Sequence, residues 1–188
     1  MDRDRFLQML MDSYRQSYDI VQSGEGPRAD GLPLAATASM RLSEEGYLLT
    51  RRARLWSADS DESVFFFSSP VLTEEVCRKG IQFAHEQGME NIDWKGNPNH
   101  MRSVITAVFL CDEAEEGAVA AVRTCRLNRS FSLSLRGWME FHAVCAALGG
   151  EQIFSNRYGR DTAKFLETLL HPRRQRQGGG SLLQKLRK

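Results

Sequence analysis

The stretch SVITAVFLC, residues 103–111, decides the fold because it is apolar at nearly every position. Successive residues of a β-strand point to opposite faces of the sheet, so a strand that is apolar on both faces has to be covered on both. We therefore predict that residues 103–111 form the central strand. Its most buried side chains are expected to be those of Val104, Ile105, Val108, Phe109 and Leu110.

Upstream of this strand the pattern predicts a helix and then an antiparallel meander. Apolar residues recur every three or four positions over residues 3–21, which is typical of one face of a helix. Alternating residues from Leu34 to Arg41 predict a strand. Two further strands are predicted over 47–56 and 63–68, and the acidic residues Asp59, Asp61 and Glu62 are expected to lie in the loop that joins them.

Three more helices are predicted around and after the central strand. Ser69-Pro70 favours a helix start, so a helix is expected over 71–88. Asp112 and Glu115 have capping-box spacing and predict a helix over 112–127. A cap at Asp161 or Thr162 predicts a helix over 161–171, which Pro172 ends.

The strands after residue 127 leave one alternative open. Residues 131–135 and 138–148 are both strand-like, with Arg136-Gly137 between them. This dipeptide is either a hairpin turn or a bulge in one long bent strand. A brief edge strand is expected at 153–154.

Together these elements predict an α+β fold, with a mainly antiparallel sheet of about five or six strands and three or four helices packed largely on one face. A chain of 188 residues suits one hydrophobic core, so we expect a single domain over residues 1–171. Residues 172–188 are expected to form a flexible basic tail, because they contain six Lys or Arg, no acid, and a triple glycine.

Composition excludes several classes of protein. Lys and Arg number 25 against 24 Asp and Glu, so the whole chain has no charge that would draw it to nucleic acid. No apolar run approaches the roughly 18 residues of a membrane span, which argues against an integral membrane protein. The start of the chain carries acids where a secretory signal is apolar, so a cytoplasmic protein is expected.

The four cysteines, Cys77, Cys111, Cys125 and Cys145, are widely spaced in the sequence and have apolar neighbours. They fit reduced core thiols better than disulfides or zinc ligands. Accordingly, no metal ion and no cofactor is expected.

Polar residues concentrate in IDWKGNPNHMR, residues 92–102, between a predicted helix and the central strand. Asp93 and Lys95 have the spacing of the metal-binding acid and lysine of some nucleases, and His100 is a candidate general base. Such a metal-dependent nuclease or phosphodiesterase needs a second carboxylate within about 4–6 Å of Asp93. The alternative is a polar connection in which Trp94 plugs the edge of the core.

Two segments supply candidate ligand-binding residues. The first is the same connection, and the second is the turn SNRYGRD, where arginines and a helix N-terminus would suit an anion. That turn has an alternative interpretation as a loop closed by a helix cap. The candidate ligand-binding residues are Trp94, Asn97, Asn99, Arg102, Asn156, Arg157, Tyr158 and Arg160.

A third function is suggested by the arginines of the meander. Arg51, Arg52 and Arg54, with Arg41 on the partner strand, would form a basic sheet face on which Trp56 stacks a base of single-stranded nucleic acid. The basic tail is expected to add weak, salt-sensitive contacts with nucleic acid or anionic surfaces.

The chain lacks the motifs of the commonest hydrolases, NTPases, dinucleotide-binding proteins and metalloproteases. We therefore expect a small, non-catalytic domain that binds another protein or a small anionic ligand, or pairs as a homodimer through a sheet face or edge. The nuclease and the single-strand nucleic-acid binder are the alternatives.

Overall fold

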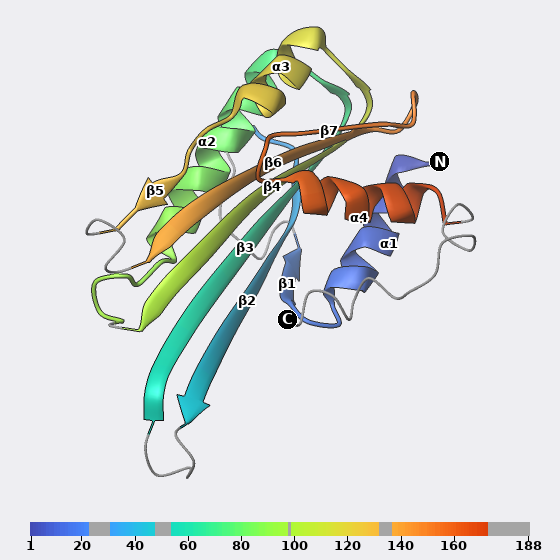
Figure 1. Ribbon diagram of the computed structural model, residues 1–188. Coiled ribbons are helices and arrows are strands. Elements are labelled where there is room, and N and C mark those ends of the chain that lie inside the picture. The colour runs from blue at the N-terminus through green and yellow to red at the C-terminus, as the bar shows by residue number, and fades with distance from the viewer. Residues whose placement is uncertain (23–30, 48–53, 98, 132–136, 173–188) are drawn as a thin grey trace.

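The structure is a computed structural model, and it describes residues 1–22, 31–47, 54–97, 99–131 and 137–172 (Figure 1). For residues 43–47 and 54–58 it describes the backbone alone. Several predictions fall outside the described residues. These are the placement of Arg51 and Arg52, the strand at 132–135 with its junction at Arg136, and the basic tail from residue 173 onward.

An α+β fold is confirmed. The described elements are α1 (Arg3–Tyr14), β1 (Asp19–Gln22), β2 (Leu34–Tyr47), β3 (Arg54–Leu72), α2 (Glu74–Glu90), β4 (His100–Ala114), α3 (Glu116–Thr124), β5 (Arg129–Ser130), β6 (Trp138–Ala147), β7 (Gln152–Ser155) and α4 (Arg160–Leu170). The sheet has the order β1-β2-β3-β4-β6-β5, and β7 pairs with β6 beyond the end of β5.

The sheet is mainly antiparallel, as predicted, but it is mixed, and it has seven described strands where about five or six were expected. The two central pairings, β3 with β4 and β4 with β6, are parallel. The outer pairings are antiparallel. Parallel neighbours need long crossovers, and α2 and the segment containing α3 provide them.

The helices lie on both faces of the sheet, so the expectation that they pack largely on one face is wrong (Figure 1). One face, here the α2/α3 face, carries Ile105, Phe109 and Phe141 in one core cluster. The opposite α1/α4 face carries Val108 and Val144 in a second cluster. The reason is the central strand itself, whose two apolar faces each require a cover, as its sequence predicts.

β3 is one continuous strand where a loop was expected. Asp59, Asp61 and Glu62 lie inside it because β3 pairs with β2 on one side and with β4 on the other. Opposite charge across the strands supports this pairing, since Arg41 Nε donates to Asp61 Oδ1 over 2.7 Å. The β2–β3 hairpin extends beyond the start of β4 and projects from the body of the sheet (Figure 1).

Helix boundaries differ from the predictions at three places. β3 continues through Ser69-Pro70 to Leu72, so α2 begins at Glu74 with Thr73 as its N-cap, and it ends at Glu90 rather than residue 88. α1 ends at Tyr14 rather than residue 21, because residues 19–22 leave the helix and pair with β2. α3 begins at Glu116, and Asp112 stays in β4, so no capping box forms. Glu115 instead accepts a hydrogen bond from the backbone N–H of Glu74 (2.9 Å) at the start of α2.

Before β6, β5 (Arg129–Ser130) pairs antiparallel with Met139 and Trp138, and the choice between a hairpin turn and a bulge at Arg136-Gly137 falls outside the described residues. Gly137 lies immediately before β6 with φ of 79°, and a Cβ there would clash with the Met101 carbonyl oxygen. Glycine is therefore required at this position. The edge strand expected at 153–154 is β7, and α4 matches the helix predicted over 161–171 with Gly159 as its N-cap.

Phe109 tests the role of the central strand. Its ring is 1% exposed and stacks on Phe67 with centroids 5.0 Å apart. We expect Phe109→Ala to reduce the free energy of unfolding by about 3–5 kcal/mol in chemical denaturation. The control Phe109→Leu preserves most of the volume and should cost less than about 1.5 kcal/mol. A loss below about 1 kcal/mol for the alanine variant would contradict the central position of β4.

Candidate functional site

The segment 92–102 closes on itself and on the neighbouring strand. Asp93 Oδ1 accepts from the backbone N–H of Gly96 over 2.7 Å, and a Cβ at Gly96 would meet the same carboxylate. Asn97 Nδ2 donates to Asp59 Oδ2 over 2.7 Å, and Asn99 N–H donates to Asn97 Oδ1 over 2.9 Å. The polar side chains of this connection thus fix the turn that leads into β4.

The aromatic part of this connection packs against the core. Trp94 stacks on Phe131 with ring centroids 5.0 Å apart, and Lys95 Nζ lies 5.3 Å from the Trp94 ring centroid. His100 is 3% exposed, and its Nε2 lies 2.8 Å from Ser103 Oγ. Trp94 therefore occupies the core edge, which is the geometry of the polar-connection alternative.

Over the described ranges, no three His, Cys, Asp or Glu side chains gather closely enough to hold a metal ion.

None of the described helices is long and apolar enough to cross a membrane.

Asn156 completes the edge of β6. β5 pairs with β6 at Trp138 and Met139, and β7 pairs with it from Val144 to Ala147, so neither strand reaches the backbone of Phe141 and Ala143. Asn156 Oδ1 accepts from Ala143 N–H over 3.2 Å, its Nδ2 donates to Phe141 C=O over 2.8 Å, and its backbone N–H donates to Ala143 C=O over 3.0 Å.

The remaining bonds of Asn156 are also internal. Oδ1 accepts a second bond from Gly159 N–H (2.8 Å), and Nδ2 donates a second one to Cys125 C=O (3.2 Å). The side chain amide has reached its full hydrogen-bonding capacity within the protein. Arg157, Tyr158 and Arg160 are exposed at the start of α4.

Arg102 differs from the other predicted residues of its segment, because it lies on the α1/α4 face of β4. The strand register and the alternation of side chains place two rows of residues on this face. Both rows lie between the last residues that pack under α1 and α4 and the projecting end of the β2–β3 hairpin, and the row nearer the helices is called the upper row. We call these two rows the open face. The upper row is Met40, Glu62, Val104 and Glu140, and the lower row is Leu42, Ser60, Arg102 and Trp138.

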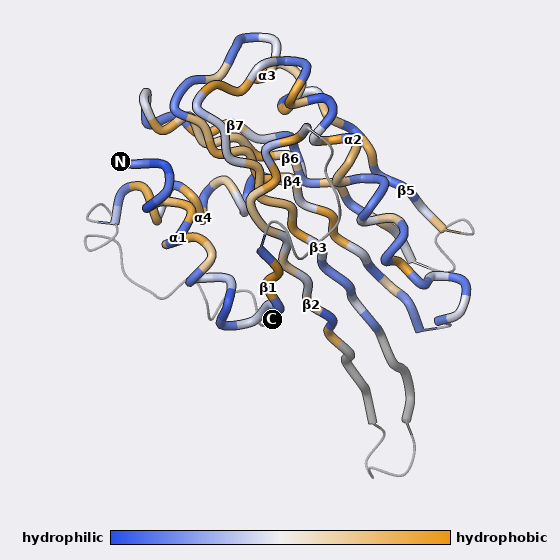
Figure 2. Tube along the Cα trace, turned by 180° about the vertical axis from the view of Figure 1, so that it is seen from behind, coloured by the Kyte–Doolittle hydropathy of each residue, from blue (hydrophilic) through white to orange (hydrophobic). Residues whose placement is uncertain are grey.

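No described helix covers the open face (Figure 1), whereas the opposite side of the same strands packs against α2 (Figure 2). The core cluster under α1 and α4 ends at Ala38 and Val64, one row above Met40 and Glu62. Leu42 and Trp138 of the lower row are 49% and 37% exposed, whereas Val104 of the upper row is 6% exposed, as its sequence predicts, and its neighbours Glu62 and Glu140 are half-buried. Central strands therefore present a mixed charged and aromatic surface where a cover would be expected.

The charges of the open face are organised around Glu140. Arg102 donates to Glu140 Oε2 through Nη2 (2.7 Å) and Nε (3.2 Å), and Trp138 Nε1 donates to Oε1 over 3.0 Å. Burial alone would raise the pKa of Glu140, but the hydrogen bonds and charge of Arg102 hold that pKa below its ordinary value. Glu140 is therefore ionised at neutral pH.

Glu62 is in a different environment on the other side of Val104. Burial raises the pKa of Glu62, and the hydrogen bond from Tyr18 and the charge of Arg102 offset this only in part. Arg102 thus lies beside two carboxyl groups, of which it holds only Glu140 in an ion pair.

The row above the open face marks the boundary of the apolar packing. Thr106 and His142 are neighbours in the register of β4 and β6, and burial lowers the pKa of His142. Thr106 Oγ1 and His142 Nδ1 are buried and hydrogen bond to none of the described residues. Unpaired buried polar atoms are uncommon and destabilising, so these strands carry polar groups at a cost in stability.

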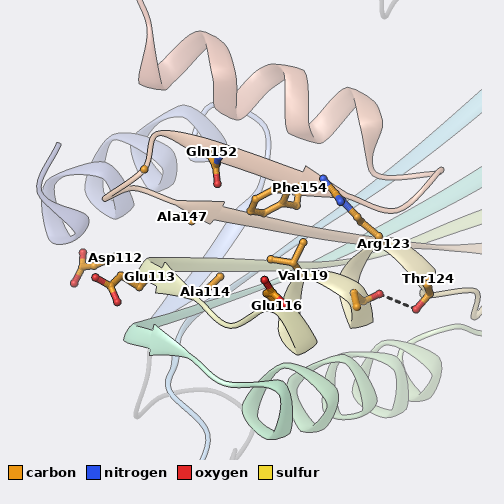
Figure 3. A pocket seen from close by; sticks show the side chains of 12 residues that line it. Asp112, Glu113, Ala114, Glu116, Val119, Arg123, Thr124, Ala147, Gln152 and Phe154 are labelled. Atoms are coloured by element: carbon orange, nitrogen blue, oxygen red, sulfur yellow. Dashed lines mark hydrogen bonds between the residues drawn. The ribbon is translucent and has the colours of Figure 1, made fainter.

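A second surface is the groove between α3 and the ends of β4, β6 and β7, with a volume of about 810 Å³ (Figure 3). Asp112 and Glu113 lie at one end, Glu116 lies near the middle beside Val119, and at the other end the guanidinium of Arg123 lies 5.0 Å from the Phe154 ring centroid. Its floor consists of small side chains such as Ala114 and Ala147. Arg123 makes a cation–π contact with Phe154, and Asp112 is paired with Arg3.

Sequence reasoning missed Glu62, Trp138 and Glu140 as site residues. Glu62 was expected in a loop, which hid its alternation with Val64 on one face of β3. Trp138, Glu140 and His142 alternate along β6, and that period of two is the signal that could have placed them together on one face.

A comparison with protein families matches residues 2–168 to the model described as a domain of unknown function, DUF8052, so the chain belongs to this family. No curated protein and no solved structure is similar enough to match.

Asn156 can be tested against a matched asparagine on the same edge. Asn156→Ala leaves buried backbone groups of Phe141, Ala143 and Gly159 without partners and should reduce the free energy of unfolding by about 3 kcal/mol or more. The control Asn128→Ala removes one acceptor, for Phe141 N–H, from an exposed side chain and should cost about 1 kcal/mol. Equal losses in urea denaturation would contradict the edge-completing role.

The effect of Glu62 on the stability of the fold is expected to depend on pH. Because its pKa is raised above the ordinary value of 4.5 on folding, the carboxyl group favours the folded state below that value and opposes it once ionised. Glu62→Gln imitates the protonated form and keeps an acceptor for Tyr18. The substitution should therefore raise the melting temperature at about pH 7 and change it little at about pH 3.5. A lower melting temperature at neutral pH would contradict this account.

Proposed function

We propose that this member of the DUF8052 family is a non-catalytic protein-binding domain and that the open face is its binding surface. The observation that carries the proposal is the contrast between the two faces of β3, β4 and β6. On one face these strands pack against α2, and on the other the alternate residues form two rows, of which the lower row with Leu42, Arg102 and Trp138 is the more exposed and is covered by no described helix.

The residue types of the open face support a protein partner. Tryptophan and arginine dominate the binding energy of protein interfaces, and here Trp138 and Arg102 are neighbours on β6 and β4. Leu42 and Met40 add apolar area on β2. With two carboxyl groups and one guanidinium, the surface suits a protein better than a small anion.

The geometry favours binding over catalysis. Both oxygens of the ionised Glu140 carboxylate accept hydrogen bonds, one from Trp138 and one from Arg102, so this carboxylate is engaged within the protein. At the other candidate centre, Asp93 is engaged by Gly96 N–H and Asp59 by Asn97. A general base needs a lone pair aimed at a substrate, and these carboxylates are directed to their own neighbours.

We further propose that the domain works in the cytoplasm. The four cysteines support this, because they are free thiols although Cys111 and Cys145 have sulfurs only 3.8 Å apart. Unbridged neighbouring thiols fit a reducing compartment.

The proposal is tested by panning a phage-displayed library of random 16-residue peptides against the protein. We expect enriched peptides whose binding is lost in Arg102→Ala and Trp138→Ala, because these side chains supply the main contacts. Arg123→Ala, on the α3 groove, is the matched control and should bind the peptides as the natural chain does. No enrichment, or peptides that bind all variants equally, would refute binding through the open face.

A further inference from the structure

The α3 groove, which lies between α3 and the ends of β4, β6 and β7, is acidic at one end (Figure 3). Asp112 and Glu113 lie at that end and Glu116 lies near the middle, and all three residues are exposed. Asp112 pairs with Arg3 over 2.7 Å, whereas Glu113 and Glu116 form no ion pair with any residue that the structure describes. Two carboxylates of the groove are therefore accessible to a cation.

The rest of the groove is largely apolar. Its floor contains Ala114 and Ala147, and Val119 of α3 and Phe154 of β7 project into it (Figure 3). Arg123, next to the Phe154 ring, is the single cation among the described residues that line the groove. An apolar strip beside accessible carboxylates suits a segment that carries both apolar and basic side chains.

The described part of the chain ends beside the acidic end of this groove. His171, the residue after α4, has its Nδ1 3.9 Å from Glu151 Oε2. Glu151 follows Gly150, which lines the groove, and in the same turn Gly149 N–H donates to Asp112 C=O over 2.9 Å. The chain therefore leaves the described fold next to the carboxylates of the groove.

We propose that the C-terminal segment of this chain, residues 173–188, binds in the α3 groove of its own fold. The segment contains six Lys or Arg, no acid, and three leucines. Its order matches the groove, because three arginines come first, next to the carboxylates, and the leucines follow the triple glycine. These residues are Arg173, Arg174 and Arg176, then Leu182, Leu183 and Leu186. The proposal goes beyond the proposed function, since it concerns a different surface from the open face.

The first part of the segment supplies charge complementarity. Its arginines start beside Glu151 and Glu113, and a guanidinium can hold a carboxylate through two parallel N–H···O bonds. Because Glu113 and Glu116 are exposed, each such ion pair is weak and is screened by salt. Charge thus positions the segment along the groove but does not hold it there alone.

The second part of the segment supplies apolar contact. The leucines pack against the strip formed by Val119, Ala120 and Phe154. Val119 and Phe154 are half-buried and Ala120 is exposed in the described fold, so the contact removes apolar area of both surfaces from water.

The covalent link makes weak contacts sufficient. α3 has nine residues and is therefore about 13 Å long. Residues 173–181 can span up to about 30 Å when extended, which brings the leucines within reach of the whole groove. A short flexible linker gives an effective concentration on the order of millimolar, so contacts with a dissociation constant of about 1 mM keep the segment bound about half of the time.

The open face is a poorer site for this segment. Its exposed lower row contains Arg102 and no acid. The carboxyl groups of the upper row are half-buried, and Glu62 is bonded to Tyr18 and Glu140 to Arg102. A basic segment therefore favours the α3 groove, where the carboxylates are exposed.

Disulfide cross-linking in the full chain tests this placement. Gln184→Cys puts a thiol among the leucines, and Thr124→Cys puts one at the exposed far end of the groove. Arg157→Cys is the control, because it is exposed and also lies about one helix length from the place where the segment begins. We expect the Gln184→Cys/Thr124→Cys pair to form an intramolecular disulfide under mild oxidation with diamide at least about tenfold faster than the Gln184→Cys/Arg157→Cys pair.

Gln184→Cys alone measures any disulfide with the natural cysteines and corrects both rates. Equal corrected rates for the two pairs would show that the segment does not occupy the groove and would overturn the inference.

Charge reversal tests which groups hold the segment. Trypsin cuts after Lys and Arg, and binding in the groove slows the release of the segment because cleavage follows the unbound fraction. Glu113→Lys with Glu116→Lys should speed the release from the full chain at least about threefold. The control Glu86→Lys with Glu90→Lys makes the same change of charge at exposed positions of α2 and should leave the rate unchanged.

Leu182→Ser with Leu183→Ser tests the apolar contact without changing the described fold or any site of tryptic cleavage. This variant should also release the segment faster than the natural chain, because the apolar strip loses its partner. Thermal melting followed by circular dichroism verifies that the glutamate variants remain folded. Release at the same rate from the natural chain, the Glu113/Glu116 variant and the leucine variant overturns the inference.

Discussion

The constraint on which the structure depends is that β4 is apolar on both faces. Phe109 and Ile105 need a cover on one side, and Val108 and Leu110 need one on the other. A strand of this kind has to lie in the interior of a sheet with helices on both sides. The parallel pairing of β4 with β3 and β6 follows, because each crossover carries a helix that covers the α2/α3 face. α1 and α4, at the two ends of the described chain, are left to cover the opposite face, and they cover only its upper part.

The elements that sequence alone predicts are those whose evidence is local. The double-sided apolar run of β4 and the amphipathic stripes of α2 and α4 were placed to within a few residues. The continuity of β3 could not be predicted from the sequence, because acidic residues such as Asp59, Asp61 and Glu62 are typical of a loop. Only the pairing with β4 and the ion pair with Arg41 show that they belong to a strand. The same holds for Asn156, which resembles a turn residue until β6 is seen to lack strand partners at Phe141 and Ala143.

The candidate site was harder to predict than the fold for a related reason. Its residues come from four strands, and only Arg102 was singled out from the sequence. Clusters that are contiguous in the sequence, such as residues 92–102, attract attention because many polar groups stand together. In the structure those groups largely satisfy one another and fix a turn. Side chains that meet through register, such as Glu62, Val104 and Glu140, carry no such local signal.

Register is also what connects the stability of the sheet with the surface that it presents. Side chains alternate strictly along a strand, so a slip of one residue in β3 would move Glu62 to the α2/α3 face and bring Phe65 and Phe67 out of their core. The burial of these two phenylalanines therefore fixes the face on which Glu62 lies. In the same way Phe141 and Ala143, held from the edge by Asn156, fix the outward direction of Glu140 on the opposite face. The apolar core of one face thus determines the charged rows of the other, and the open face keeps its pattern for as long as the core keeps its register.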